Sequence, residues 1–575
     1  MLRLFKYLKP YAPAAVATAA LVACQAMAEL YLPTLMSDIV NKGITRGDTG
    51  YIIHTGGLML AVAVGGACCA VLAGYLAAQV SMGFGEILRQ RMFAHVTALS
   101  LHEFDRFSTP SLITRTTNDV TQVQMVTMVG LRMMIMAPIM CVGGIIMAVS
   151  KDRDLAWILV VVIPLLAGVI AWVAFKGFPL FRSIQAKLDR ITQVMREGLS
   201  GVRVIRAFDQ IEHQRGRFRE ANLDLTGTTV RVNRIMAVLM PVMILVMSYT
   251  TIAIIWFGSI RVNHGTSNVG DMMAFLQYAM QIMFSMMMAI LLFIMLPRGQ
   301  ASAERIAEVL EMAPTIGDPA APAAPACSVC GHVAFRGVTF AYHGAEEPAL
   351  RDISFAATPG KVTAIIGSTG SGKSTLISLI PRFYDVGAGT VEVDGVDVRA
   401  MAQADLRARI GFVPQKAVLF SGTVADNIRY GKPDATDDEV RHAAATAQAT
   451  AFIEAMGGFD AVIAEAGANL SGGQKQRLAI ARALVRQPEI YVFDDSFSAL
   501  DFKTDAKLRA ALRQEIAHAT VLIVAQRVAT VLDADQIIVL DEGRIAGIGS
   551  HRQLYKDCQL YREIVASQLS EEELR

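Results

Sequence analysis

The sequence is poor in charge for its length. Only 18% of its 575 residues are charged, whereas 53% are hydrophobic, and the mean hydropathy is +0.42. Soluble domains carry more charge and fewer apolar residues, so a chain that is soluble throughout is excluded. The net charge of +2 identifies no partner by itself, and we expect no nucleic acid among the partners.

Cysteine is also scarce. There are seven cysteines, an odd number, and most of them lie in apolar runs, so we predict no disulfide framework. Cys327 and Cys330 form a single CxxC beside Pro325, without the second pair or the thioredoxin-like context that a zinc or redox site needs. We interpret both as incidental linker residues.

We also expect no cleavable signal peptide, because none is evident in the first residues. The first residues, "MLRLFKYLKPY", are basic and amphipathic, which predicts a cytoplasmic segment that lies on the membrane surface before the first span. Loop charge gives the orientation. Basic residues crowd the long segment between residues 176 and 234, and the short loops after the first and fifth runs carry little net charge, so both termini are expected in the cytoplasm.

Six apolar runs are long enough to cross a bilayer. They predict an all-α membrane domain over residues 1–311, with spans at residues 11–36, 51–84, 120–150, 155–175, 235–260 and 272–296. The long segments between the second and third spans and between the fourth and fifth are expected to be helical and cytoplasmic. The host membrane is predicted to be the cell (plasma) membrane, namely the inner membrane of a bacterium.

The pattern changes after Leu296. An amphipathic helix is followed by a Pro- and Ala-rich linker over residues 312–332, which we expect to be extended and semi-rigid. From Val333 to Arg575, short β-branched runs alternate with helical stretches, which predicts a soluble α/β domain.

A phosphate-binding motif lies in this second domain. The stretch "GSTGSGKS" follows a strand-like run and fits the P-loop pattern, although a glycine-rich turn is the alternative. The glycines allow backbone N–H groups to close around phosphate oxygens. Lys373 is expected to reach the β- and γ-phosphates of ATP, and the Ser374 hydroxyl to ligate Mg²⁺. The candidate ATP-binding residues are Gly367, Ser368, Thr369, Gly370, Ser371, Gly372, Lys373, Ser374 and Thr375.

Further motifs follow in a fixed order. "PQ" ends at Gln415, "LSGGQKQR" begins at Leu470, and "YVFDDSFSALD" runs from Tyr491 to Asp501. The apolar run before Asp494 predicts a buried strand whose end presents an acid to the metal. These motifs and the six preceding spans resemble a half-transporter of the ABC exporter family over essentially the whole chain. The predicted fold is therefore an α-helical membrane domain joined to an α/β P-loop ATPase domain, and the predicted activity is ATP-driven transport.

The resemblance implies roles for individual residues. Tyr342 matches the aromatic residue that stacks on adenine, Gln415 the glutamine that senses Mg²⁺, and Asp501 an interface loop. The segments Phe104 to Asp119 and Leu199 to Phe208 resemble the two coupling helices. The signature residues, which act on the ATP of the opposite subunit, match Leu470, Ser471, Gly472, Gly473 and Gln474, and the Mg²⁺ ligands match Ser374, Gln415 and Asp494.

Two positions depart from the family pattern. Asp495 stands where the family usually has a catalytic glutamate, and Gln526 stands where it usually has a histidine that contacts the γ-phosphate. A carboxylate withdrawn by one methylene moves about 1.5 Å, and a misplacement of about 1 Å can cost roughly 10²-fold in rate. The resemblance therefore predicts weak hydrolysis at this P-loop and a second half-transporter that supplies the glutamate and the histidine. A homodimer with two slow sites, an importer and a mainly regulatory subunit remain alternatives.

The substrate is expected to be amphipathic or hydrophobic, such as a drug, a lipid or a peptide. Two ionisable residues, Glu29 and Arg132, lie within or near apolar spans, where such residues usually face a cavity or a partner. A position near the membrane edge is the alternative, and Glu29 is the better candidate for substrate contact. Methionines crowd the third, fifth and sixth spans; core or lipid-facing packing and a methionine-lined cavity are both compatible with them.

Overall fold

The computed structural model describes residues 2–323 and 330–568. The chain forms two compact units, of which the first comprises residues 1–97 and 109–312 and the second residues 98–108 and 313–575. A short segment from the N-terminal half of the chain thus belongs to the C-terminal unit. The two units are described separately.

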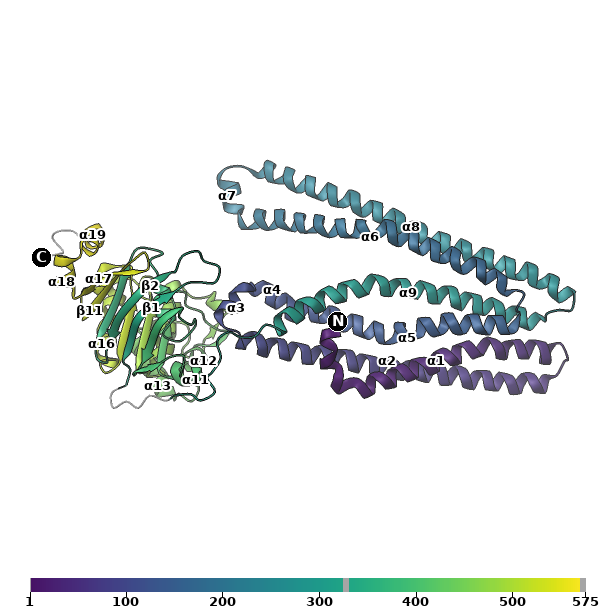
Figure 1. Cartoon of the computed structure of the whole chain (residues 1–575), viewed down its shortest axis with the longest axis horizontal. Helices are drawn as coiled ribbons and strands as arrows, with labels where there is room; N and C mark the ends of the chain where they lie inside the picture. The colour runs from purple at the N-terminus through teal and green to yellow at the C-terminus, as the bar shows by residue number, and fades with distance from the viewer. Residues whose placement is uncertain (1, 324–329, 569–575) are drawn as a thin grey trace. The chain divides into compact units, whose positions relative to one another are not determined.

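The first unit is all helical (Figure 1). Among the described residues of this unit, six stretches are long and apolar enough to cross a membrane, and this confirms the predicted α-helical membrane domain. Its elements are η1 (Leu2–Tyr11), α1 (Ala12–Asp38), η2 (Ile39–Ile44), α2 (Thr49–Ala98), α4 (Thr109–Thr114), η3 (Arg115–Asp119), α5 (Val120–Lys151), α6 (Ala156–Ser200), α7 (Val202–Ala207), α8 (Ile211–Asn263) and α9 (Val269–Leu310).

The helices are longer than the apolar runs that predict them. Helix α8 has 53 residues, which at about 1.5 Å per residue exceeds the roughly 30 Å hydrocarbon core of a bilayer. Its polar first half therefore lies outside the membrane. Helices α6 and α8 run side by side, and the short helix α7 forms the tip between them (Figure 1).

Small residues allow the central helices to approach closely. A Cβ atom on Gly143 of α5 would lie 2.4 Å from Leu30 Cδ1 of α1, and one on Gly144 would lie 2.8 Å from Ile282 Cγ1 of α9. Glycine at these two positions is what permits α5 to pack against both neighbours. Several methionines, including Met140 and Met283, are buried in this core, which fits the packing interpretation for them.

The second unit contains the predicted α/β domain. Its main sheet has the strand order β12-β11-β3-β10-β9-β6, parallel except for the antiparallel edge strand β12. These strands are β3 (Val362–Gly367), β6 (Ile410–Val413), β9 (Ile490–Asp494), β10 (Thr520–Val524), β11 (Gln536–Asp541) and β12 (Arg544–Gly549). An antiparallel sheet of order β2-β1-β4-β5 is formed by β1 (Val333–Phe340), β2 (Leu350–Ala357), β4 (Ala388–Val393) and β5 (Val396–Asp397), and β7 (Gly422–Thr423) pairs with β8 (Val462–Ile463).

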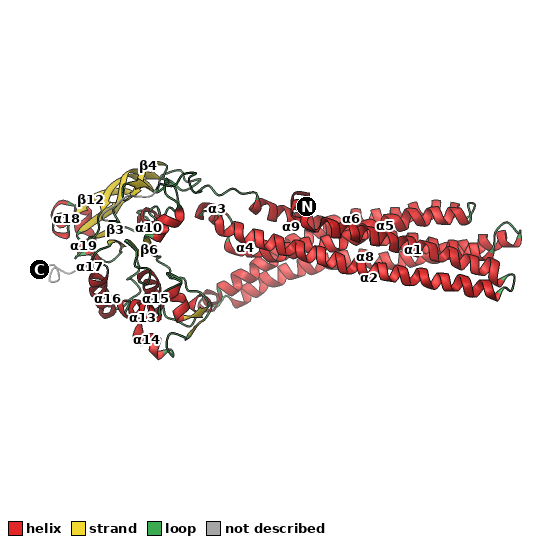
Figure 2. Ribbon diagram, turned by 90° about the horizontal axis from the view of Figure 1, so that it is seen from below, coloured by secondary structure: helices red, strands yellow, loops and turns green. Residues whose placement is uncertain are grey.

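Apart from α3, which precedes every strand, the helices of this unit lie between or after the strands along the chain. Figure 2 shows α13, α14, α15 and α16 grouped away from the antiparallel sheet. The helices of the second unit are α3 (Leu101–Arg106), α10 (Lys373–Ser378), α11 (Gln403–Ala408), α12 (Val424–Arg429), α13 (Asp437–Thr446), α14 (Thr450–Ala455), η4 (Glu465–Gly467), α15 (Gly472–Leu484), α16 (Phe502–Glu515), α17 (Val528–Val531), α18 (His551–Asp557) and α19 (Gln559–Gln568).

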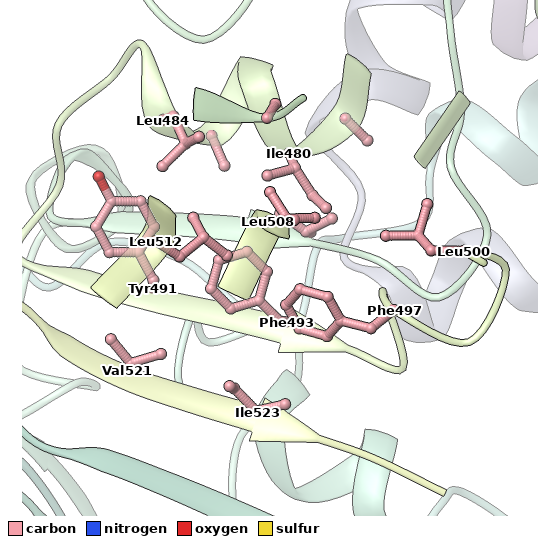
Figure 3. Close-up of a cluster of buried hydrophobic side chains, with 14 of the residues drawn as sticks. Ile480, Leu484, Tyr491, Phe493, Phe497, Leu500, Leu508, Leu512, Val521 and Ile523 are labelled. Carbon is pink, nitrogen blue, oxygen red and sulfur yellow. The ribbon is translucent and has the colours of Figure 1, made fainter. Parts of the chain in front are cut away.

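Alternation along β9 sorts its side chains between two cores. Tyr491 and Phe493 pack on one face of the sheet, under Ile480 of α15 and Leu508 of α16 (Figure 3). Val492 faces the opposite core, which also contains residues of α10. Because side chains alternate along a strand, Asp494, two residues after Val492, points to the same side, where α10 lies. The apolar sequence of β9 thus aims its terminal acid at the P-loop.

The cysteines agree in part with expectation. Five of them, Cys24, Cys68, Cys69, Cys141 and Cys558, are free. Cys330 is disulfide-bonded, which corrects our interpretation of it as an incidental residue. Cys327 lies outside the described residues.

Candidate nucleotide-binding site

The P-loop joins β3 to α10 through glycines whose backbone conformations other residues rarely adopt. Gly370 and Gly372 have φ angles of 86° and 97°, in the left-handed region that side chains rarely adopt. A Cβ atom on Gly367, at the end of β3, would lie 2.1 Å from the carbonyl oxygen of Leu540. The loop therefore requires glycine for its conformation and for its close approach to β11.

Lys373 lies inside the curve of this loop. Its Nζ atom donates hydrogen bonds to the carbonyl oxygens of Gly367, at 2.9 Å, and Ser368, at 2.6 Å. The side chain is largely buried, and burial lowers the pKa of its ammonium group, while the charges of Asp495 and Asp494 raise it. A positive charge held here by backbone oxygens is suited to a polyphosphate.

Ser374 and Asp494 meet beside the P-loop. The Ser374 hydroxyl donates to Asp494 Oδ1 at 3.0 Å, and Asp494 is only 7% exposed. Burial raises the pKa of Asp494, as does the charge of Asp495, and the Ser374 hydrogen bond and Lys373 oppose this shift. A hydroxyl and a buried carboxylate form an oxygen-donor set that suits Mg²⁺, so the residues present fit this ion.

Asp495 follows with an unusual backbone conformation. Its φ angle is 46°, which aspartate tolerates better than most residues, and its N–H donates to the Val524 carbonyl oxygen at 3.0 Å. Two glutamine amides donate to one carboxylate oxygen, Oδ2: Gln526 Nε2 at 2.9 Å and Gln415 Nε2 at 3.4 Å. The two residues that depart from the family pattern are therefore in direct contact.

Burial raises the pKa of the Asp495 carboxyl group, and hydrogen bonds from Ser498 and Gln415 oppose the shift. A carboxylate oxygen that already accepts two amide hydrogen bonds is held in place by them and has fewer lone pairs left for a hydrogen bond from water. This contact was not foreseen from the sequence, which placed Gln526 at the γ-phosphate.

The position of Gln526 depends on the C-terminal helix α19. Gln568 of α19 donates through Nε2 to the Gln526 carbonyl oxygen at 2.9 Å, and its Oε1 accepts from the Val528 N–H at 2.8 Å. Sequence reasoning missed Gln568, because nothing in the local pattern of α19 distinguishes it from other exposed polar residues.

Tyr342 stands near the P-loop helix. Its hydroxyl lies 3.0 Å from Thr375 Oγ1, and its ring makes edge-to-face contacts with Phe340 and Tyr384. The side chain is 42% exposed, so one part of it is available to a ligand. This placement is compatible with the stacking role that the family resemblance implies.

The signature motif starts helix α15. Ser471 caps the helix: its hydroxyl accepts from the Gln474 N–H at 3.3 Å, and Gln474 Oε1 accepts from the Ser471 N–H at 2.8 Å. Within the described part of the chain, the polar groups of Ser471 and Gln474 bond to each other and not to the P-loop. Asp501 similarly caps α16 by accepting from the Thr504 N–H at 2.9 Å. Ser471 and Asp501 therefore both act as helix N-caps.

Helix α3 packs against the α/β domain within the second unit. The Thr315 hydroxyl donates to Glu103 Oε1 at 2.6 Å. Burial tends to raise the pKa of Glu103, but hydrogen bonds from Ser100 and Thr315 outweigh it and lower this pKa. The predicted coupling segment, Phe104 to Asp119, therefore divides: its start completes α3, and the rest forms α4 and η3 in the membrane unit.

Two further contacts connect α3 with the neighbourhood of Tyr342. The Tyr384 hydroxyl donates to Asp105 Oδ2 at 3.4 Å, and burial, followed by the charge of Asp105, raises the pKa of Tyr384 to about 12. The rings of His102 and His343 meet edge to face, with centroids 4.9 Å apart. Sequence reasoning located the coupling segment but none of these contacts.

A P-loop around a lysine, a buried acid at the end of β9 and six potential membrane spans define a membrane transporter driven by ATP. The family models agree: "ABC transporter transmembrane region" matches residues 16–286 and "ABC transporter" matches residues 350–498. The chain belongs to the ABC transporter family, as a half-transporter with one membrane domain and one ATP-binding domain. It is an ATPase-coupled, multi-pass membrane protein with a cytoplasmic ATPase domain.

Known relatives cover nearly the whole chain. An uncharacterized ABC transporter ATP-binding protein of Mycobacterium tuberculosis is 46% identical over 98% of this chain and 97% of its own length. An ATP-dependent lipid A-core flippase of Chromobacterium violaceum is 32% identical over 99% of this chain and 97% of its own length. Among solved structures, a bacterial Atm1-family ABC exporter with ATP bound matches with a TM-score of 0.79 and 25% identity, over 98% of this chain and 99% of that one.

Proposed function

We propose that this chain is one half of a heterodimeric ABC exporter, and that it carries the weak ATP site of the pair. Its substrate is an amphipathic or hydrophobic molecule such as a drug, a lipid or a peptide. The similarity to lipid A-core flippases and to an Atm1-family exporter supports export and a lipid-like substrate class. The proposed location is the bacterial inner membrane.

The observation that carries the proposal is the contact between Asp495 and Gln526. The Asp495 carboxylate is one methylene shorter than the usual glutamate, and the Gln526 amide 2.9 Å away occupies one of its oxygens. An efficient general base must reach its water and accept a proton from it. Asp495 is weakened in the first respect, because its carboxylate is short and one of its oxygens is held by the amide, whereas Lys373, Ser374 and Asp494 retain the arrangement that binds ATP and Mg²⁺.

Dimerisation is supported by two features. Ser471 and Gln474 form a capped helix start whose hydrogen bonds, among the described residues, do not involve the P-loop of the same chain. The α7 tip exposes apolar side chains: none of its residues is buried, and the adjoining Phe208 is 72% exposed. Exposed apolar side chains grouped at a helix tip are candidates for an interface. In the proposed dimer, the signature acts on the partner's ATP and the α7 tip docks on the partner.

In this mechanism the chain's own residues bind and orient ATP. Tyr342 stacks on the adenine, the P-loop and Lys373 hold the phosphates, and Ser374, Asp494 and Gln415 would hold Mg²⁺, which neutralises phosphate charge when bound. Asp495 orients water poorly, so ATP at this site persists while the partner's site turns over. Glu29 and Arg132 are the candidate substrate contacts in the membrane unit.

The proposal is tested by comparing the purified chain alone with the chain co-expressed with a candidate partner half-transporter, both in lipid nanodiscs. We expect low ATPase activity from the chain alone and substrate-stimulated activity from the pair. Lys373→Ala should reduce transport less than the matching lysine change in the partner. Rapid stimulated hydrolysis by the chain alone would refute the heterodimer, and equal losses from both lysine changes would refute the asymmetry.

Direction and dimer contact need separate measurements. Efflux and uptake of a labelled amphiphile in inside-out vesicles distinguish an exporter from an importer, and ATP-dependent release from the vesicles would contradict export.

Phe208→Ser should weaken dimer formation, measured by light scattering, and leave ATP affinity unchanged. An unchanged dimer would remove the α7 tip from the interface.

A further inference from the structure

A polar cluster lies at membrane depth between α1 and α9. Gln25 and Glu29 are four residues apart on α1, so both are on one face of the helix, and Gln281 comes from α9. Glu29 is nine residues before Asp38, the last residue of α1, which corresponds to about 14 Å of helix. Polar side chains at this depth are expensive and usually serve a function.

The hydrogen bonds of the cluster use one N–H of each glutamine amide and leave both amide oxygens without a partner among the described residues. Gln25 Nε2 donates to Glu29 Oε1 at 2.9 Å, and Gln281 Nε2 donates to the Glu29 backbone carbonyl at 3.2 Å. The Oε1 atoms of Gln25 and Gln281 are buried and have no hydrogen-bond partner among the described residues. Gln25 itself is only 7% exposed.

No cation balances Glu29 within the described part of the chain, where no ion pair includes it. Its carboxylate is half-buried, so it remains partly accessible from outside the helix pair. An unpaired acceptor in an apolar medium costs free energy until a donor reaches it. A carboxylate and two amide oxygens are all acceptors, and a donor that carries positive charge complements them better than a neutral one.

An apolar groove lies close to this cluster. Ser285 is one helical turn from Gln281 on the same face of α9, and it lines a groove of about 350 Å³ between α5 and α9. Met134, Pro138, Cys141 and Met286 form much of the wall. This volume lies in the range of pockets that accept drug-sized ligands, and its surface suits a hydrocarbon body.

We propose that Glu29, oriented by Gln25 and assisted by Gln281, binds the cationic, hydrogen-bond-donating head of an amphipathic substrate whose apolar body lies in the α5–α9 groove. The inference rests on the proposed transport of amphiphiles and adds the charge of the head group. A primary amine or a guanidinium satisfies these acceptors, whereas an anionic head would be repelled by the Glu29 carboxylate and would leave both amide oxygens without a donor.

The test uses three probes with the same pyrene-labelled alkyl chain and an amine, an alcohol or a sulfate as head group. Binding to the full-length protein in phosphatidylcholine nanodiscs is measured by fluorescence anisotropy, after subtraction of empty nanodiscs. We expect the amine to bind at least about tenfold more tightly than the alcohol, the scale of one charge-assisted hydrogen bond. Glu29→Gln should abolish this preference.

Glu304→Gln is the matched control. Gln300 and Glu304 form the same four-residue pair on α9, with Nε2 donating to Oε1 at 3.1 Å, but they are exposed and outside the predicted span. This variant should retain the preference for the amine. Unchanged ATP affinity and gel-filtration behaviour of both variants shows that they are folded.

The inference is overturned if Glu29→Gln retains the amine preference or if the three probes bind equally. Disruption of the dimer by Glu29→Gln with the preference intact would also overturn it, and would assign Glu29 to a subunit contact. ATP-driven movement of the probes is measured on the same samples with the partner present. Transport without head-group selection refutes this inference alone, whereas absence of ATP-driven movement of every probe refutes the proposed function.

Discussion

The contact between Asp495 and Gln526 predicts that the two positions must be changed together to restore hydrolysis. Replacing Asp495 by glutamate advances the carboxylate by about 1.5 Å, toward an amide nitrogen that is already only 2.9 Å from Oδ2. The longer side chain cannot keep its direction unless Gln526 moves. Asp495→Glu alone should therefore raise the hydrolysis rate less than about tenfold.

Gln526→His alone should also have a small effect, because the short carboxylate still cannot reach its water. With both changes the carboxylate is advanced and the amide is removed from its path. A correction of about 1 Å is worth roughly 10²-fold in rate, so we expect the double variant to gain about that factor. The gain beyond the product of the single effects is then about tenfold or more, which corresponds to about 1.4 kcal/mol of coupling.

The assay is single-turnover hydrolysis of γ-labelled ATP by full-length protein in nanodiscs. When a partner is present, its own P-loop lysine is changed to alanine so that only this chain's site reports. Equal ATP affinities for all four proteins show that the chemical step has changed. Asp541→Glu, at the exposed end of strand β11 in the same sheet, is the control for the same substitution elsewhere. Single effects that multiply to the double effect within about twofold would refute the coupling.

Three other changes probe the remaining contacts. Lys373→Ala removes the ammonium group held by P-loop carbonyls and should weaken ATP binding, measured by calorimetry, by about 10- to 150-fold, the range for hydrogen bonds to charged groups; unchanged affinity would contradict its role. Thr315→Val removes the 2.6 Å donor to Glu103 and should speed hydrogen exchange in residues 98–108 by about 5- to 150-fold; an unchanged rate would show that this bond does not hold α3. Ser374→Ala removes one expected Mg²⁺ ligand beside Asp494 and should raise the Mg²⁺ concentration for half-maximal activity by about tenfold; an unchanged Mg²⁺ dependence would exclude Ser374 as a ligand.

The fold was predictable because its strongest signals are local. Runs of apolar residues longer than a bilayer is thick predict membrane spans, and "IYVF" before Asp494 predicts a buried parallel strand. The P-loop glycines also follow from the sequence, since Gly370 and Gly372 adopt the left-handed conformation that the motif requires. In each case one short segment contains enough information to define its own structure.

The contacts around Asp495 could not be predicted in this way, because they join distant segments. Gln415, Gln526 and Gln568 come from three separate parts of the chain, and the sequence does not show which amide donates to which oxygen. The same holds for α3. Ser100 and Glu103 predict a capped helix, but its partner Thr315 is more than two hundred residues away. Long-range side-chain geometry depends on packing that no single segment specifies.

The contact also changes how the two departures at this site are understood. As separate substitutions, Asp495 and Gln526 would each remove one catalytic group. In contact, they form a stable pair, because the amide satisfies a carboxylate whose pKa burial raises. Without Gln526, the partly buried Asp495 would lose the shorter of its two amide hydrogen bonds. The pair therefore stabilises the folded site while it holds a short carboxylate in place, and a site with this property is suited to holding ATP while another site hydrolyses it.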